Sequence, residues 1–282
     1  MAGSDGAAVA PLGIIGGYGF YELLTGADEV QLDTPYCEPS DALVVGSFEG
    51  VPVAFVPRHG RGHRIPPHRV NYRANLWALH EVGVRRVIAP CAVGSLREDL
   101  APGTFVVLDQ LVDRTWGRPD TFFDGPGSLG GTATEAVTHV SLADPYCPHL
   151  RRLATAALEQ TGIAHRNAGT VVVIQGPRFS TRAESRWYSS AGWDVIGMTS
   201  YPEAALAREL AMCIAGIALV TDYDAGLEDP DAVAPVSAAQ VIETFAANVA
   251  NLRALLAVLV PSVPQERECD CAAALDGAQL GS

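Results

Sequence analysis

Short runs of apolar residues alternate along the chain with segments whose apolar positions recur every three or four residues. The short runs are typical of buried strands, and the periodic segments are typical of amphipathic helices. Three consecutive valines at 171–173 indicate a strand that is buried on both faces. The expected strands are 12–16, 42–45, 51–57, 84–89, 105–111, 169–174, 194–198 and 213–220, and the expected helices are 71–81, 148–161, 182–191, 203–211 and 237–260.

This alternation predicts an α/β protein whose central sheet is covered by helices on both faces. Residues 1–262 are expected to form one domain, because neither a repeat nor a linker interrupts the pattern. The segment 115–131, rich in Gly, Pro and Asp, suits a functional loop better than a domain boundary. Residues 263–282 are polar and rich in small side chains, which predicts a flexible C-terminal tail.

The amino-acid composition disfavours some classes of binding partner. The chain of 282 residues has 19 Lys and Arg against 32 Asp and Glu, and its net charge of −13 disfavours a broad surface for nucleic acid or anionic membrane. A few local cations are still enough to bind a small anion. The N-terminal segment lacks the basic flank and apolar core of a signal peptide, and no apolar run approaches the ~20 residues of a membrane span. The protein is therefore expected to be cytoplasmic.

Four of the six cysteines (Cys37, Cys91, Cys147 and Cys213) lie singly in the sequence and are expected to be reduced. Cys269 and Cys271 form a C-x-C pair in the tail. That spacing does not match a zinc site by itself, because no second Cys or His pair lies near it. Free thiols, an incidental disulfide and a deliberate clamp of the tail remain open.

Two segments that follow expected strands have the composition of anion-binding loops, and ligands of open α/β sheets bind beyond the carboxyl ends of strands. Residues 16–19 are Gly-Gly-Tyr-Gly, which frees backbone N–H groups for an anion, although a tight turn explains them equally well. They lack the G-x-G-x-x-G spacing of a dinucleotide site. Residues 58–61 are Arg-His-Gly-Arg, a cationic loop in an acidic chain, and arginine matches phosphate oxygens. A solvated basic surface is the alternative.

Two further segments follow the strands 84–89 and 213–220. Residues 91–95 are Cys-Ala-Val-Gly-Ser, whose small side chains let backbone donors face a ligand, although packing alone also explains them. Asp222 and Asp224 are two residues apart on an extended segment, so their side chains point the same way. Carboxyl groups there are suited to bind or protonate the nitrogens of a heterocycle, and a turn or cap is the alternative.

Taken in order, these segments resemble the methylthioadenosine phosphorylase branch of the trimeric purine nucleoside phosphorylase family. The resemblance covers residues 12–259, nearly the whole chain. The matching segments are GIIGG at 13–17, DTP at 33–35, PSDAL at 39–43, RHG at 58–60, VNY at 70–72, AN at 74–75, WAL at 77–79, GSLRE at 94–98, DQ at 109–110, DRT at 113–115, FDG at 123–125, GPRFS at 176–180, RAES at 182–185, MT at 198–199, PE at 202–203 and TDYD at 221–224.

The resemblance implies a mixed sheet that is partly closed into a distorted barrel and surrounded by helices, in a homotrimer. It implies phosphorolysis of 5′-deoxy-5′-methylthioadenosine, or of a close 5′-modified adenine nucleoside, to adenine and a 5-modified ribose 1-phosphate in purine salvage. The expected partners are the nucleoside and phosphate, with neither a metal nor an organic cofactor.

The resemblance also implies a role for each matching residue. The phosphate-binding positions are Gly17, Tyr18, Arg58, His59, Cys91, Ala92 and Thr199. Asp222 matches the general acid that protonates purine N7, and Asp224 matches the acceptor of the 6-amino group. The remaining substrate-binding positions are Phe179 stacked on the purine, Ser180 and Thr221 beside it, Met198 against the ribose, Val236 in the 5′ pocket and His139 reaching that pocket from a neighbouring subunit.

The chain departs from the family at Tyr18 and Cys91, where members usually carry Ser or Thr. A tyrosine is too large to place its hydroxyl where a serine would, and a thiol is a weak donor. Each lost hydrogen bond to phosphate would cost about 1.5–3 kcal/mol. Phosphate is still expected as the nucleophile. The alternatives are hydrolysis of the same bond, another purine nucleoside specificity (5′-halo-5′-deoxyadenosine or a 6-oxopurine), and a non-catalytic nucleoside-binding protein.

Overall fold

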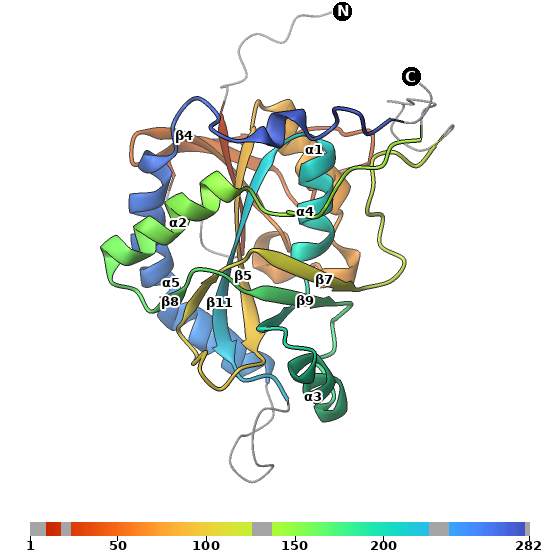
Figure 1. Ribbon diagram of the computed structural model, residues 1–282. Coiled ribbons are helices and arrows are strands. Elements are labelled where there is room, and N and C mark those ends of the chain that lie inside the picture. The colour runs from red at the N-terminus through yellow and green to blue at the C-terminus, as the bar shows by residue number, and fades with distance from the viewer. Residues whose placement is uncertain (1–9, 18–23, 126–136, 226–236, 280–282) are drawn as a thin grey trace, which may run out of the picture.

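The computed structural model describes residues 10–17, 24–125, 137–225 and 237–279. Its centre is a mixed sheet of 11 strands (Figure 1). From one edge the order is β2 (Thr25–Val30), β3 (Leu43–Phe48), β4 (Val51–Pro57), β1 (Leu12–Gly16), β5 (Arg86–Ser95), β10 (Val195–Gly197), β9 (Thr170–Ile174) and β7 (Gln110–Arg114). The other three strands branch from β5, in the order β11 (Cys213–Asp222), β6 (Phe105–Val107) and β8 (His165–Arg166).

Part of this sheet closes on itself. β5 pairs with β1 and then β10 along one side, and with β11 along the other. β11 pairs with β6, and the chain leads from β6 directly into β7, which pairs with β9. The strands β5, β10, β9, β7, β6 and β11 form a partly closed ring, joined between β7 and β6 by the chain and not by strand pairing, and this ring is the distorted barrel that the family resemblance implied.

Helices cover both faces of the sheet, as the alternating pattern predicted (Figure 1). α1 (Tyr72–Glu81) packs with α4 (Ser200–Glu209), and α4 contacts β11. α2 (Pro148–Thr161) and α5 (Ala238–Ser262) also contact β11, and they pack against each other. All ten residues of β11 are buried, because helices lie on each side of it. Nowhere in the described part of the chain does a helix have the length and apolarity needed to cross a membrane.

Several elements differ from the sequence-based expectation. β5 continues to Ser95, so residues 91–95 belong to the strand and not to a loop after it, and the short strand β8 was not expected. β2 was not expected, because its sequence TGADEV is exposed and has no apolar alternation; it is held by its pairing with β3. The single strand expected at 105–111 is two strands, since the backbone N–H of Leu108 donates to Gly216 O (3.0 Å) while that of Asp109 donates to Gly169 O (3.2 Å). α4 begins three residues before the expected position, at Ser200.

The C-terminal tail folds back over the sheet after α5. Arg86 Nη2 donates to Gln265 O (2.8 Å), Arg267 Nη1 donates to Ala211 O (2.6 Å), and the backbone N–H of His139 donates to Ala278 O (2.8 Å), so the tail is attached at several points. Cys271 follows and is 4% exposed. This packing differs from the flexible tail that the polar composition predicted, because contacts through backbone carbonyls and one buried thiol leave little trace in composition.

Candidate active site

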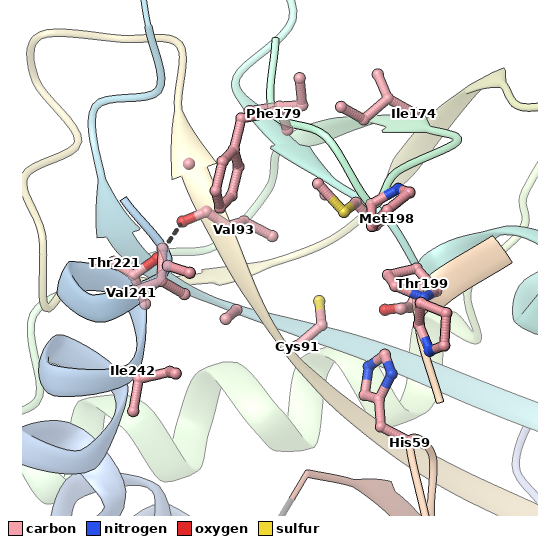
Figure 2. Close-up of a pocket in the computed structure, with 18 of the residues that line it drawn as sticks. His59, Cys91, Val93, Ile174, Phe179, Met198, Thr199, Thr221, Val241 and Ile242 are labelled. Atoms are coloured by element: carbon pink, nitrogen blue, oxygen red, sulfur yellow. Dashed lines mark hydrogen bonds between the residues drawn. The ribbon is translucent and has the colours of Figure 1, made fainter. Parts of the chain in front are cut away.

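A cleft of about 490 Å³ opens where β4, β5, β10 and β11 end (Figure 2). β5 and β11 run parallel, so the residues that end them lie at one edge of the sheet. In Figure 2, His59 and Thr199 lie toward one end of the cleft, Thr221 lies toward the other, and Cys91 lies between them. The cleft therefore joins the anion-binding loop and the carboxyl groups that the sequence singled out separately.

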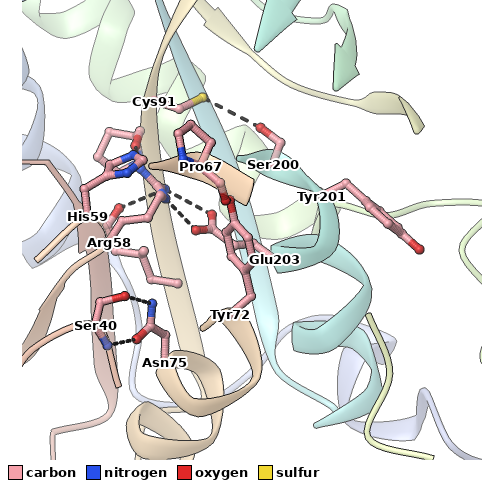
Figure 3. Close-up of polar contacts among 12 residues, drawn as sticks. Ser40, Arg58, His59, Pro67, Tyr72, Asn75, Cys91, Ser200, Tyr201 and Glu203 are labelled. Atoms are coloured by element: carbon pink, nitrogen blue, oxygen red, sulfur yellow. Dashed lines mark hydrogen bonds and ion pairs between the residues drawn. The ribbon is translucent and has the colours of Figure 1, made fainter. Parts of the chain in front are cut away.

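Arg58 follows β4 directly and is 3% exposed. Its guanidinium forms a bidentate ion pair with Glu203 of α4, in which Nη2 donates to Oε2 (3.0 Å) and Nε donates to Oε1 (Figure 3). Burial alone would lower the pKa of Arg58, but the charge and hydrogen bonds of Glu203 raise it, so the side chain stays cationic. Nη1 also donates to Pro90 O (3.0 Å) and Nη2 to Ile15 O (3.3 Å). Of five N–H groups, one on Nη1 remains without a partner in the described segments.

The ring of His59 is neutral and has a defined tautomer. Its Nδ1 lies 2.8 Å from Ile65 O, and because a carbonyl only accepts, Nδ1 carries the proton and Nε2 is the acceptor. Burial, and then the charge of Arg58, lower the pKa of His59 to about 3. The ring also stacks on His63, with centroids 4.2 Å apart. Such an imidazole is suited to accept a hydrogen bond from a protonated phosphate oxygen.

The middle of the cleft contains a thiol beside a hydroxyl. Cys91 Sγ lies 3.7 Å from Ser200 Oγ, and burial raises the pKa of the Cys91 thiol, so the thiol is neutral (Figure 3). Thr199 precedes α4 and is 7% exposed, and its side chain makes no capping hydrogen bond. Ser200 was not singled out from the sequence, although it follows Thr199 directly. Its hydroxyl stands next to the thiol that departs from the family pattern.

Asp222 and Asp224 form a buried carboxyl pair at the end of β11. Asp222 Oδ2 accepts from Thr221 Oγ1 and Oδ1 accepts from the backbone N–H of Asp224, both over 2.8 Å. Burial raises the pKa of both groups, and the charge of Asp224 raises that of Asp222 further. The pair therefore retains a proton at a higher pH than ordinary aspartates would.

Gly94 of β5 makes room for this pair. A Cβ at this position would lie 2.9 Å from Asp222 Oδ1, 3.1 Å from Ile196 Cγ2 and 3.2 Å from Asp224 Cβ. Any side chain would therefore push at least one carboxyl group away. Glycine here allows the two aspartates to pack against the backbone of the neighbouring strand.

Two polar atoms expected to face the base are buried and unsatisfied. Asp224 Oδ2 and Ser180 Oγ each lack a hydrogen-bond partner in the part of the chain that the structure describes; Asp224 lines the cleft, whereas Ser180 follows the lining residue Phe179 and does not line the cleft itself. Phe179 and Met198 line the same cleft as apolar surfaces (Figure 2). Buried polar atoms normally find partners, so this end of the cleft suits a flat, partly polar ligand.

The other expected site residues lie elsewhere. Tyr18 and Val236 are outside the described residues. Gly17 is not among the residues that line the cleft, although its neighbour Gly16 accepts from the backbone N–H of Arg58 (2.9 Å). His139 is exposed and does not line the cleft of its own chain; its backbone N–H donates to Ala278 O (2.8 Å).

The structure adds cleft residues that the sequence did not reveal. The first turns of α5 contribute Ala238, Val241 and Ile242, and a proline pair before α1 contributes Pro66 and Pro67. Apolar residues at the start of a helix look like ordinary core positions, so their role depends on where the helix packs.

Comparison with known proteins gives consistent matches over nearly the full length. The sequence matches the phosphorylase superfamily over residues 11–261. A purine nucleoside phosphorylase of Streptomyces coelicolor is 54% identical over 274 residues, which cover 96% of each chain. An S-methyl-5′-thioadenosine phosphorylase of Mycolicibacterium smegmatis is 51% identical and covers 95% of this chain and 97% of its own. The structure of methylthioadenosine phosphorylase from Schistosoma mansoni in complex with adenine aligns with a TM-score of 0.88 at 37% identity, over 96% of this chain and 99% of that one.

Proposed function

The chain belongs to the phosphorylase superfamily, and we propose that it cleaves the N-glycosidic bond of 5′-deoxy-5′-methylthioadenosine, or of a close 5′-modified adenine nucleoside, with phosphate. The products are adenine and the 5-modified ribose 1-phosphate. The observation that carries this proposal is the buried pair Asp222 and Asp224 in one cleft with Arg58 and His59. We propose that phosphate is the second substrate and that the residues of the cleft perform the reaction without a resident metal or organic cofactor.

Cleavage of the C1′–N9 bond leaves positive charge on the sugar and negative charge on the purine, and both must be stabilised in the transition state. We assign phosphate to the end of the cleft near Arg58, His59 and Thr199, with Ala92 and Cys91 beside it. The unpartnered N–H of Arg58 and the Thr199 hydroxyl donate to phosphate oxygens. The neutral His59 ring accepts from the P–OH group. Phosphate is then both the nucleophile and the counter-charge of the sugar cation.

The purine occupies the opposite end of the cleft. We assign Asp222 as the general acid, because burial raises its pKa and so favours the protonated form that donates to N7 as the base departs. The unpartnered Oδ2 of Asp224 accepts from the 6-amino group, which favours adenine, because a 6-oxopurine would present an acceptor there. Phe179 stacks on the ring, and Met198 packs against the ribose.

The 5′ substituent faces an apolar wall. Val241 and Ile242 of α5 and Pro67 line the cleft, and an apolar group such as methylthio matches them better than a hydroxyl does. We further propose a cytoplasmic homotrimer, in which the exposed His139 completes the 5′ pocket of a neighbouring subunit. Trp116 and Trp187, exposed at 67% and 49%, offer apolar surface for such contacts.

Two observations keep a second function in view. The Streptomyces coelicolor relative is a purine nucleoside phosphorylase, so a different purine preference is one alternative. Glu203 also occupies two of the five N–H groups of Arg58, and Cys91 replaces a hydroxyl, which together favour weak phosphate affinity or water as the nucleophile.

A substrate panel with and without phosphate tests the proposal. We expect release of adenine from methylthioadenosine to exceed release of base from adenosine, inosine and methylthioinosine, and to require phosphate. A 5′-halo-5′-deoxyadenosine in the panel measures the size limit of the 5′ pocket. Undiminished adenine release in phosphate-free buffer, with free methylthioribose as the product, would show that the enzyme is a hydrolase.

A further inference from the structure

Four cysteines from three distant segments meet at the end of β11 that lies away from the cleft. Cys147 precedes α2, Cys213 begins β11, and Cys269 and Cys271 belong to the tail. Their four Sγ atoms all lie within 4.8 Å of one another. All four thiols are free. The partners that the C-x-C pair lacks in the sequence are therefore supplied by the fold.

We propose that Cys147, Cys213, Cys269 and Cys271 bind one Zn²⁺ ion as a closed structural tetrathiolate site. Zinc sites with four cysteines are tetrahedral with Zn–S bonds of about 2.3 Å, which sets their S···S distances at about 3.8 Å. The Cys147–Cys269 and Cys213–Cys269 Sγ pairs lie 3.6 and 3.4 Å apart. Small movements of the side chains bring the four sulfurs to the corners of that tetrahedron.

The surroundings fit a structural metal and not a catalytic one. Leu150 and Ala215 are buried around the thiols, and Leu153 and Val263 pack against them. Four sulfur ligands in an apolar setting leave no open position for water or substrate. A zinc ion with four thiolates would carry a net charge of −2, which the start of α2 would stabilise, because the backbone N–H of Leu150 donates to Cys147 Sγ (3.5 Å).

A pair of disulfides is the competing use of the same thiols. Two disulfides would use all four thiols, and each would bring its two sulfurs to about 2.05 Å. Cys269 lies nearly as close to Cys147 as to Cys213, so its position does not favour a disulfide with one of these two over the other. One sulfur between two others suits a shared central ion. Disulfides also need an oxidant, whereas zinc binding needs only the metal and releases thiol protons.

The position of the cluster predicts what the metal would do. β11 runs from Cys213 to Asp222, and ten extended residues separate the two ends by about 30 Å. A metal ion there is too far away to take part in nucleoside cleavage. It would instead fasten the tail to the start of α2 and to β11. Figure 1 shows the tail crossing the end of the molecule opposite the arrowhead of β11.

Metal analysis and thiol titration of the untagged protein, purified without chelator from zinc-supplemented cells, test the proposal. We expect about one zinc per chain by mass spectrometry. We expect all six thiols to react after denaturation with chelator. Missing thiols without metal would mean disulfides and would overturn the proposal. Reduced, metal-free protein that takes up no Zn²⁺ in a competition titration would overturn it as well.

Single substitutions separate the cluster from other thiols. Cys269→Ser and Cys271→Ser should lose most of the bound zinc, while Cys37→Ser, at an exposed cysteine outside the cluster, should retain it. Co²⁺ added to the reduced wild type should give the intense thiolate charge-transfer and visible bands of a tetrahedral site, and these bands should weaken in Cys271→Ser. Chelation should lower the Tm of the wild type more than that of Cys271→Ser. Wild-type zinc content in both serine variants would refute the assignment, and circular dichroism checks that each variant is folded.

Discussion

The ion pair of Arg58 with Glu203 gives the most quantitative prediction about the site. We consider Glu203→Gln, which keeps the shape of the side chain and removes its charge. The two side chains are 3% and 2% exposed, so water screens their interaction very little. Loss of one partner from a buried pair costs about 3–5 kcal/mol, because the remaining charge is left buried and uncompensated. Glutamine still offers one acceptor oxygen, so we expect the lower end of this range.

Glu209→Gln is the matched control. Glu209 ends the same helix and accepts from Thr121 Oγ1 (2.7 Å) and the backbone N–H of Phe122 (2.6 Å), both of which are neutral donors. Glutamine there loses one hydrogen bond from a neutral donor to the carboxylate, which costs about 1.5–3 kcal/mol and leaves no buried charge uncompensated. Urea unfolding at one fixed protein concentration measures both variants, since an oligomer's stability depends on concentration.

Phosphate should reduce the loss of stability that Glu203→Gln causes. In the wild type, Glu203 occupies two N–H groups of Arg58 and balances its charge. In the variant, a bound anion takes over part of that role. Saturating phosphate should therefore raise the free energy of unfolding of the variant more than that of the wild type. Equal destabilisation by Glu203→Gln and Glu209→Gln would show that the Arg58–Glu203 ion pair does not contribute the expected stability. Equal stabilisation of the variant and the wild type by phosphate would show that Glu203 does not compete with phosphate for Arg58.

The carboxyl end of the cleft gives three further predictions. Asp222→Asn should lower kcat by about 10²–10⁴-fold while nucleoside affinity by calorimetry stays nearly constant, and unchanged turnover would refute Asp222 as the acid. Because burial raises the pKa of Asp222, kcat/KM should fall as the pH rises through that pKa and the acid loses its proton, and a pH–rate profile of Asp222→Asn should lack this alkaline limb. Gly94→Ala should push Asp222 aside at a cost of about 1–3 kcal/mol and lower kcat/KM up to ~100-fold. Gly13→Ala, whose Cβ would lie 2.8 Å from Val84 Cγ1, should lower stability without changing kcat/KM.

The main elements and the residues at both ends of the cleft were predictable because the sequence signals for them lie within a few neighbouring residues. Buried strands such as β9 and β11 have continuous apolar sequences, and the basic loop at Arg58 stands out in an acidic chain. Asp222 ends a buried strand, and Asp224 follows two residues later. Each of these features lies within a few neighbouring residues, where periodicity and charge are visible.

The features that escaped prediction depend on residues that meet only in the folded chain. β2 is polar and exists through its pairing with β3, and the strand break at Leu108 reflects two different pairing partners. Glu203 is one acidic residue in an alanine-rich helix, and nothing local shows that it faces Arg58 across 145 positions of sequence. The cysteine cluster is the extreme case, because its ligands come from three separate segments.

The complete burial of β11 has a consequence for motion during turnover. A strand whose amides are paired on both sides exchanges its hydrogens with deuterium only when large parts of the molecule open. Asp222 lies at the end of that strand, so the proton donor belongs to a part of the enzyme whose backbone amides are expected to exchange slowly. We therefore expect any motion that accompanies substrate entry and product release to occur in the segments around the strand, while Asp222 keeps its position between catalytic cycles.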